Sequence, residues 1–368
     1  MRLPLPSLLT GALLLAGFIA CDSDDDAPVR PEEPLVVPAT YDFENVAYTG
    51  QQERIAMLGE LKVAMQEAVE GEPVSAERLR AMYANEEGAD FWNTYEKDLR
   101  SKTLEAVRED YDRYLTTFAE LAGDDTEPIA GPGTAGRVTS GERTYLVDGA
   151  GVEWAQIIEK GLMGATFYYQ ATTVYLGEER MSADNTDVVP GEGTAMEHHW
   201  DEAFGYLGVP RDFPANTDDL QFWGSYTDRR DPVLATNEPL MDALLKGRAA
   251  ISAGELDVRD EAIAEARAAW ERVAVGSAIH YLNVAERSTG DVGARLHALS
   301  EAVAFAYALP FNTATSVDRQ AFRAWLDDLA GGEDFESIDL YGVTDAQIAA
   351  ARTSLATTYE LTGLASEL

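Results

Sequence analysis

This sequence of 368 residues is poor in the side chains that carry most redox, nucleophilic and metal chemistry. It has one cysteine, Cys21, and only four histidines. With a single cysteine there can be no internal disulfide, so the core must supply the stability of the fold. The chain also lacks a lysine-containing phosphate-binding loop and a Gly-x-Ser-x-Gly turn, which argues against the enzyme classes built on those motifs.

Positive charge is the next shortage. The chain has 28 Lys and Arg against 65 Asp and Glu, a formal net charge of −37, and only five of the basic residues are lysine. Such a surface repels nucleic acid and anionic lipid, and it favours cations and high salt. We therefore expect no nucleic-acid partner, and we interpret the acidity as that of a halophile rather than as a docking surface for a cationic partner.

The first 20 residues are typical of a bacterial secretory signal. Arg2 is followed by an apolar run over 8–20, which is too short to span a membrane. Phe18-Ile19-Ala20-Cys21 resembles a lipobox, in which the cysteine is lipidated and becomes the mature N-terminus. The alternative is plain secretion with a free thiol.

The lipobox interpretation implies a membrane partner through a lipid anchor at Cys21. It places the protein in the cell envelope, on the periplasmic side or the outer surface. Residues 1–20 are then the signal peptide, and residues 21–40 form an acidic, flexible tether.

Beyond residue 40, almost every long segment has helical apolar spacing. We predict an all-α fold of two related antiparallel helical bundles, with at most a short β-hairpin near 144–147. The first bundle half covers 41–225 and the second covers 226–368. The predicted helices are 46–70, 75–85, 91–121, 154–176, 194–207, 240–250, 260–287, 291–309, 318–329 and 344–361, with a loop and turn region over 210–231.

The most informative segment is GTAMEHHWDEAFGY, residues 193–206, because it holds two of the four histidines. Thr194 and Glu197 have the spacing of a capping box, which marks the start of a helix. Glu202 lies three residues after His199 and four after His198, so it neighbours both rings. A histidine pair beside a carboxylate is a typical ligand set for a transition metal. The helical wheel also directs His199, Glu202 and Tyr206 toward a groove between helices.

An internal similarity suggests a duplicated unit. Residues 159–169 and 271–281 share an acid–base pair, a mid-helix glycine followed by a small residue, and a tyrosine. A His-x-x-x-Glu-Ala segment follows each copy. A mid-helix glycine costs about 1 kcal/mol relative to alanine. Gly164 and Gly276 therefore indicate places where helices approach closely.

The second His-x-x-x-Glu segment lies in the apolar helix predicted at 291–309. His297, Ser300 and Glu301 have no solvated face there, and an unpaired buried carboxylate costs several kcal/mol. His297 and Glu301 either complete a metal site from the second half or form a buried structural pair. The structural interpretation is slightly favoured.

Plainer interpretations exist for the other candidates as well. His198 is alternatively a surface residue that pairs with Glu202. His199 is alternatively a core residue that donates a hydrogen bond, and His280 a core residue that serves only in packing. The acid–base pairs of the two copies suggest ion pairs between the halves more than catalysts. These pairs are Glu159 with Lys160, which we also expect to line the cleft, and Glu271 with Arg272.

With these residues in view, the chain resembles imelysin-like proteins, a bacterial envelope family historically classed as metallopeptidases and linked to iron uptake. It is most similar to an imelysin-related lipoprotein family, domain of unknown function 4856, over roughly residues 40–365. The similar segments are YDFENVAYTGQ, EKGLMGA, EHHWDEAFGYLG and HALSEA. The imelysin signature is Gly-x-His-x-x-Glu. His199 and Glu202 match it, whereas Glu197 replaces the glycine and implies a second carboxylate in the site.

The resemblance leaves three hypotheses for function. The favoured one is a lipid-anchored metal-binding protein, most simply for iron, that acts in uptake or sensing with an envelope transport protein as a further expected partner. The second is a zinc-dependent peptidase, although no His-Glu-x-x-His motif is present. The third is a non-catalytic structural or interaction lipoprotein. The candidate metal ligands are His199, Glu202, His198 and Glu197, with His297 and Glu301 from the second half.

Overall fold

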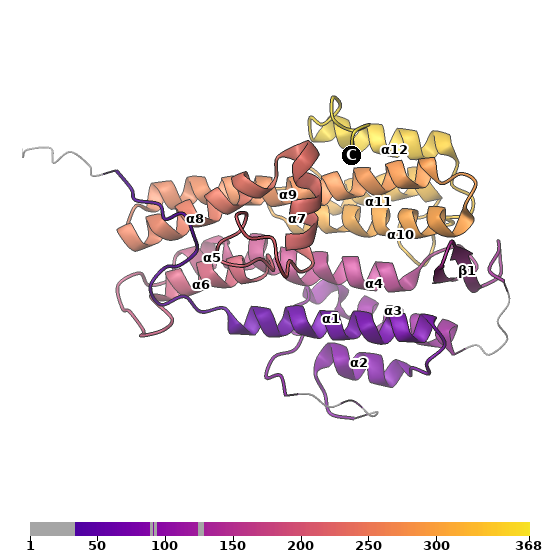
Figure 1. The fold of residues 1–368 in the computed structure, drawn as a ribbon, viewed down its shortest axis with the longest axis horizontal. Coiled ribbons are helices and arrows are strands. Elements are labelled where there is room, and N and C mark those ends of the chain that lie inside the picture. The colour runs from indigo at the N-terminus through magenta and orange to yellow at the C-terminus, as the bar shows by residue number, and fades with distance from the viewer. Residues whose placement is uncertain (1–33, 89–90, 92–93, 124–128) are drawn as a thin grey trace, which may run out of the picture. The chain divides into compact units, whose positions relative to one another are not determined.

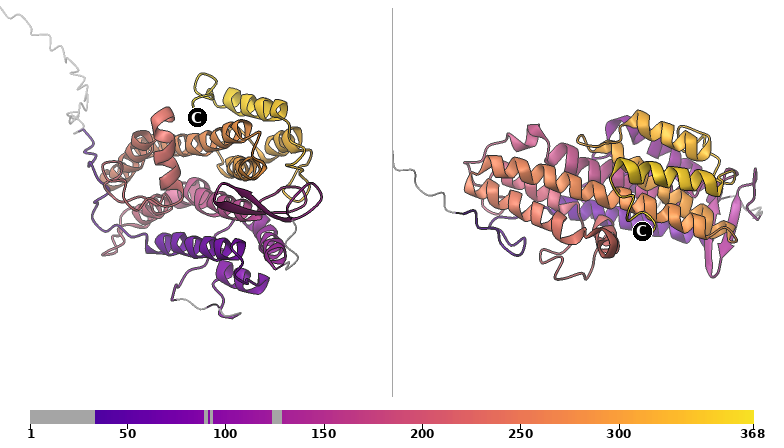
Figure 2. Two further views of the ribbon diagram at one scale, coloured as in Figure 1. Left: turned by 45° about the vertical axis from the view of Figure 1, so that its right-hand side comes forward. Right: turned by 90° about the horizontal axis from the view of Figure 1, so that it is seen from above.

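The computed structural model describes residues 34–88, 91, 94–123 and 129–368, and this part of the chain is helical apart from one β-hairpin (Figures 1 and 2). The predicted all-α class is therefore confirmed. Residues Leu35–Leu368 form one compact unit. Cys21, the signal sequence and most of the predicted tether lie outside the described residues. No helix within the described ranges is long and apolar enough to cross a membrane.

The helices are joined by short turns in some places and by longer segments in others, such as residues 182–194 and 206–222. In chain order, the elements are α1 (Thr49–Val69), α2 (Ala76–Ala84), the 3-10 turn η1 (Glu105–Val107), α3 (Arg108–Ala122), β1 (Gly136–Ser140), β2 (Arg143–Val147), α4 (Trp154–Leu162), η2 (Met163–Tyr168), η3 (Gln170–Tyr175), α5 (Glu178–Met181), α6 (Ala195–Gly205), α7 (Trp223–Leu234), α8 (Asn237–Ala253), α9 (Leu256–Arg287), α10 (Val292–Ala308), the 3-10 turn η4 (Leu309–Phe311), α11 (Arg319–Ala330) and α12 (Asp345–Thr358). The two strands pair antiparallel, with Gly136 opposite Val147.

Two long helices organise the packing. Helix α9 contacts α7, α8, α10 and α12, and α10 in turn contacts α4. On the other side of α4 lies α1, which also contacts α2 and α6 (Figure 1). The side chains of Trp200, Trp223 and Trp270 are fully buried in this core.

The two mid-helix glycines mark close approaches, as predicted. A Cβ atom on Gly164 would lie 2.7 Å from the Cβ of Ala308 in α10. A Cβ atom on Gly276 would lie 2.3 Å from a methyl group of Leu234 in α7. At Gly164 a larger residue would meet the Cβ and backbone of Ala308, whereas at Gly276 the end of the Leu234 side chain would have to shift. These close approaches explain why the cost of a helical glycine is tolerated.

The predicted helix over 154–176 is continuous but changes its winding. After α4, the segments η2 and η3 are π-helical. Side chains compete for the backbone carbonyls here: the Trp223 indole donates to the Met163 carbonyl at 2.8 Å, and the Thr172 hydroxyl donates to the Tyr168 carbonyl at 2.7 Å. π-Helical turns are rare and often occur at functional sites.

The predicted helix over 91–121 is wrong in its first half. Helix α3 begins only at Arg108, after the turn η1. The Asp98 carboxylate accepts hydrogen bonds from the backbone N–H and the hydroxyl of Ser101, which gives the chain a local alternative to helix. The backbone N–H of Leu104 donates to the Ala165 carbonyl in η2. Tertiary hydrogen bonds therefore outweigh the apolar spacing in this segment.

The predicted loop over 210–231 contains the start of a helix, α7, which the sequence reading missed. The segment is polar and carries Pro232 within the helix. The predicted boundary between the halves, at 225/226, falls inside α7. The division into two halves stays a prediction.

The segment before α1 is an extended strap, residues 35–48, that lies against α6 and α8. The Tyr41 ring is stacked on Phe204 with centroids 3.7 Å apart, and its hydroxyl donates to Asp201 at 2.9 Å. The Arg248 guanidinium lies 5.0 Å from the Phe43 ring centroid. Tyr41 is fully buried, so the strap is part of the folded body.

Candidate functional site

The cluster around α6 is built on the helix start that the sequence predicted. Thr194 accepts a hydrogen bond from the backbone N–H of Glu197, and the Glu197 side chain accepts one from the backbone N–H of Thr194. This capping box fixes the residue at which the helix begins, and with it the direction in which each later side chain points. It leaves His198, His199 and Glu202 half-buried on the face toward α1 and η3.

One carboxylate oxygen faces both imidazoles. Glu202 Oε2 lies 3.1 Å from His199 Nδ1 and 4.0 Å from His198 Nε2. The other oxygen, Oε1, accepts a hydrogen bond of 2.9 Å from the Gln51 side-chain amide in α1. The ring centroids of the two histidines are 6.2 Å apart and tilted by 44°, so the two rings are not closed on a common point.

The environment of Glu202 favours its charged form. Burial alone would raise the pKa of this carboxyl, but hydrogen bonds from His199 and Gln51, with smaller contributions from His198 and Tyr175, hold its pKa below the usual value. Glu202 is therefore an ionised, oriented carboxylate between two imidazoles.

Further polar groups surround this cluster. The Lys102 ammonium donates to the Tyr175 hydroxyl at 3.1 Å, and burial together with nearby Arg54 lowers the pKa of Lys102. Tyr206 is fully buried and packs between Phe167 and Tyr175. Two buried polar atoms here, the Tyr206 hydroxyl and His198 Nδ1, have no hydrogen-bond partner in the described part of the chain.

The second His–Glu pair sits in a different environment. His297 Nδ1 lies 2.7 Å from Glu153, and His297 Nε2 lies 3.2 Å from Glu301. Both ring nitrogens are thus occupied by carboxylates, and the Tyr145 ring is stacked on the imidazole with centroids 4.6 Å apart. Burial would lower the pKa of His297, but the hydrogen bonds to Glu153 and Glu301 raise it to about 10, so this histidine is an imidazolium ion at neutral pH.

A chain of alternating charges continues from this pair across the bundle. Glu301 lies 3.5 Å from the Lys160 ammonium, which lies 2.7 Å from Glu159. Glu159 also accepts a hydrogen bond of 3.0 Å from Lys62 in α1. Lys160 thus links α4 to Glu301 of α10, in the predicted second half, whereas Glu159 pairs with Lys160 and Lys62 within the predicted first half. The geometry of His297 and Glu301 favours the structural interpretation.

Glu197 is engaged elsewhere. Its Oε1 accepts hydrogen bonds from Arg248 and from the Ser252 hydroxyl, both at 2.6 Å, and its Oε2 caps the helix. Arg248 also donates to Asp201 at 2.9 Å. Burial raises the pKa of Asp201 to about 6, against the opposing charge of Arg248. Glu197 therefore belongs to a buried ion-pair cluster rather than to the histidine cluster.

The structure thus brings together His198, His199 and Glu202, and it separates them from the other candidates. No hydrogen bond or ion pair within the described residues joins His199 or Glu202 to His297 or Glu301. Within the same ranges, no group of three or more His, Cys, Asp and Glu side chains is placed, as it stands, so that it could hold a metal ion.

The sequence reading missed three polar neighbours of the cluster, namely Gln51, Lys102 and Tyr175. Gln51 lies 151 residues from Glu202 in sequence and is brought to it by the packing of α1 against α6. Lys102 is one of only five lysines. The scarcity of lysine is the one feature of the sequence that distinguishes Lys102.

The comparison with known families covers nearly the whole folded body. The chain matches the family described as "Domain of unknown function (DUF4856)" over residues 38–362. This chain belongs to that family. No curated protein and no solved structure matches it. The match includes most of the strap, the histidine cluster and the second His–Glu pair of this DUF4856 protein.

Proposed function

We propose that this DUF4856 protein binds a divalent transition metal ion, such as iron or zinc, at His198, His199 and Glu202. In this proposal it acts in the bacterial cell envelope, on a lipid anchor at Cys21, in uptake or sensing. The observation that carries the proposal is the ionised Glu202 oxygen that faces two imidazole nitrogens at once.

The distances suit a site that closes on an ion. Ligand bonds of about 2.1 Å at tetrahedral angles separate two ligand atoms by about 3.4 Å. The two nitrogen–oxygen distances to Glu202, 3.1 and 4.0 Å, lie on either side of that value. Rotation of the half-buried His198 ring would bring its Nε2 closer, and Glu202 is already held in place by Gln51. Such outer partners commonly orient metal ligands.

The donor set is consistent with several metals. Two nitrogens and one oxygen, with no sulfur, suit iron, zinc or manganese. Three protein ligands leave one or more positions for water. Binding is better supported than peptide hydrolysis, because a peptidase also needs a free carboxylate as base. Glu202 is a ligand in this proposal, and the oxygens of Glu197 are already occupied.

The test is elemental analysis and calorimetric titration of the purified protein with Zn²⁺ and, under anaerobic conditions, Fe²⁺. We expect about one ion per chain in the wild type, and its loss in the double variant His199→Ala/Glu202→Ala. His280→Gln is the matched control, because it removes a histidine of α9 that lies outside the cluster and forms no ion pair with Asp or Glu in the described residues. Equal metal binding by the wild type and the double variant, or no binding by either, contradicts the proposal.

A further inference from the structure

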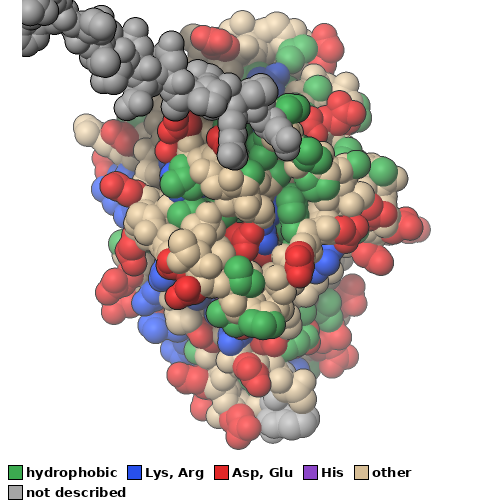
Figure 3. Space-filling model, turned by 90° about the vertical axis from the view of Figure 1, so that its left-hand side faces the viewer, with side chains coloured by type: hydrophobic (Ala, Val, Ile, Leu, Met, Phe, Trp, Pro, Cys, Tyr) green, Lys and Arg blue, Asp and Glu red, His purple; other side chains and the backbone are tan. Residues whose placement is uncertain are grey.

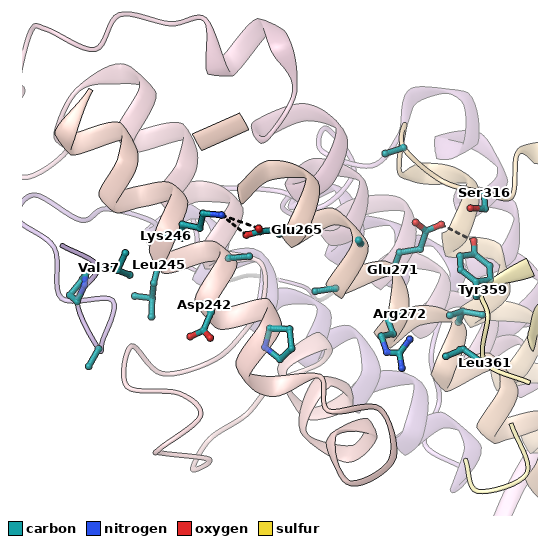
Figure 4. Close-up of a pocket in the computed structure, with 18 residues that line it drawn as sticks. Val37, Asp242, Leu245, Lys246, Glu265, Glu271, Arg272, Ser316, Tyr359 and Leu361 are labelled. Carbon is teal, nitrogen blue, oxygen red and sulfur yellow. Dashed lines mark hydrogen bonds and ion pairs between the residues drawn. The ribbon is translucent and has the colours of Figure 1, made fainter. Parts of the chain in front are cut away.

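A cavity of about 1120 Å³ lies on a different part of the molecule, between α8, α9 and the segments that carry Val37 and Tyr359 (Figure 4). It shares no residue with the histidine cluster. Its wall is mostly aliphatic, with Ala243 and Leu245 from α8, Ala268 and Val275 from α9, and Val37 and Leu361 from the flanking segments.

Glu271 forms one end of this cavity, and its carboxylate is only partly satisfied. The residue is 7 % exposed. Its Oε1 accepts hydrogen bonds from the hydroxyls of Tyr359, at 2.7 Å, and Thr315. Its Oε2 accepts a long contact of 3.5 Å from the Asn312 amide, and the backbone of Ser316 also hydrogen-bonds to the carboxylate. Figure 4 shows the Tyr359 contact at the end of the cavity opposite Val37.

All the side chains that contact Glu271 are neutral. In the part of the chain that the structure describes, Glu271 forms no ion pair with Lys, Arg or His, so the predicted pairing between the halves is absent at this acid. Arg272, its neighbour in sequence, instead donates to the Leu234 carbonyl at 3.3 Å. A buried carboxylate without a cation is costly unless a partner supplies the positive charge.

The charged side chains that line the cavity include more carboxylates than basic groups. Lys246 is neutralised by Glu265 at 2.9 Å and by Glu261 at 3.5 Å. Beyond that pair, the lining residues contribute two carboxylates, Asp242 and Glu271, against the single guanidinium of Arg272. The bare cavity therefore favours a small cation over an anion.

We infer that this cavity binds a small aliphatic amine, whose ammonium group donates to Glu271 Oε2 while its methylene groups lie along the wall of alanine, valine, leucine and proline. A charge-assisted hydrogen bond would satisfy the oxygen that the protein leaves weakly bonded. The aliphatic wall would gain from covering by methylene groups. Burial raises the pKa of the Glu271 carboxyl despite hydrogen bonds from Thr315 and Tyr359, and a bound ammonium would reverse that shift.

The experiment is calorimetric titration of the whole protein in about 0.15 M NaCl, which screens distant surface charge. The probes are 1,6-diaminohexane and its neutral counterpart hexane-1,6-diol. We expect the diamine to bind and the diol not to. Glu271→Gln should weaken diamine binding by about tenfold or more, because it removes the charge and keeps the shape.

Two controls make the test specific to the cavity. Glu120→Gln removes an exposed carboxylate of α3 that does not line the cavity, so it should leave the diamine affinity within about twofold. His199→Ala/Glu202→Ala should also leave it unchanged, which separates this inference from the metal proposal. No diamine binding to the wild type, equal binding of diamine and diol, or equal affinity in Glu271→Gln and wild type overturns the inference. Thermal unfolding without amine verifies that Glu271→Gln is folded.

Discussion

The two His-x-x-x-Glu pairs of this protein have the same spacing but different electrostatic environments. In the first pair, His198 lies 4.0 Å from Glu202, and His198 Nδ1 has no hydrogen-bond partner among the described residues. In the second pair, His297 lies 3.2 Å from Glu301 and its other nitrogen contacts Glu153 at 2.7 Å. The same local motif thus leaves a nitrogen free to bind a ligand in the first pair, whereas in the second pair both nitrogens of the histidine are already bonded to carboxylates.

The neighbours of each pair cause this difference. The carboxylate of the first pair is held by a neutral amide, Gln51, whereas the carboxylate of the second is held by the buried Lys160. A buried charge with a full set of partners adds rigidity, but it has no lone pair or proton to offer a ligand. The motif alone therefore does not predict a metal site.

The largest expected effect is on the second pair. Lys160→Met should lower the free energy of unfolding by about 3–5 kcal/mol, because it leaves Glu159 and Glu301 buried with fewer counter-charges. Urea unfolding followed by circular dichroism measures the change. Lys62→Met removes the half-exposed partner of the same Glu159 and should cost less than about 1 kcal/mol. Equal losses in the two variants would show that burial does not set the difference.

The first pair should respond to metal instead. At a Zn²⁺ concentration 100 times the dissociation constant, the wild type should gain about 2.7 kcal/mol of unfolding free energy. This gain should vanish in His199→Ala and persist in Lys62→Met. Thermal unfolding with and without Zn²⁺ provides the measurement. Stabilisation that persists in His199→Ala would assign the ion to another site.

The pH dependence of stability should reveal the second pair. The pKa of His297 is raised to about 10 in the folded state, above about 6.5 in an unfolded chain. Its contribution to stability is therefore fully present below pH 6.5 and is lost as the pH rises to 10. The slope from this one proton is at most about 1.4 kcal/mol per pH unit. The free energy of unfolding, measured from pH 6.5 to 10, should fall less steeply in His297→Gln than in the wild type. Parallel curves would refute the imidazolium assignment.

The smallest expected effect concerns the ring stacked on His297. Tyr145→Leu should cost about 0.5–2 kcal/mol and should lower the pKa of His297, because an aromatic face stabilises a cation. Tyr145→Phe retains the ring and should match the wild type in that pKa. Nitrogen-15 chemical shifts of the imidazole, followed through an alkaline titration, measure it. An unchanged pKa in Tyr145→Leu would leave the stacking with a packing role only.

The acidic composition is also visible on the molecule. Figure 3 shows Asp and Glu side chains over much of the periphery of one face. Inside, however, the acidic residues Glu153, Glu159, Asp201 and Glu301 are buried, and each has a basic partner. The net charge of −37 therefore lies mainly on the surface. These buried acids share basic partners, and Glu271 is the buried acid that has no such partner among the described residues.

Local patterns predicted what depends on neighbours in sequence. The apolar spacing gave most of the helices, and the capping box gave the start of α6 to the residue. The contacts of Glu202 with two histidines followed from helical spacing, because residues three and four apart share a face. Gly164 and Gly276 were correctly interpreted as close approaches because nothing within a helix favours glycine.

Contacts between distant segments could not be predicted from the sequence. Glu153 lies 144 residues from His297, and only the packing of α4 against α10 shows that both nitrogens of that histidine are occupied. The non-helical start of 91–121 depends on a hydrogen bond to the Ala165 carbonyl. The π-helical segments have ordinary helical spacing, and their winding depends on contacts such as that of Trp223 with Met163.

The strap has a mechanical consequence. Tension along the chain from residues upstream of 34 enters the folded body through the strap, where Tyr41 and Phe43 contact α6 and α8. The load would fall first on the contacts of Tyr41 and Phe43 with Phe204, Asp201 and Arg248, and only then on α1. Arg248 holds both Glu197 and Asp201 of α6, and Glu197 lies two positions before His199. Tension on the N-terminal side would therefore reach α6, the helix that carries His198 and His199, before it reaches α1.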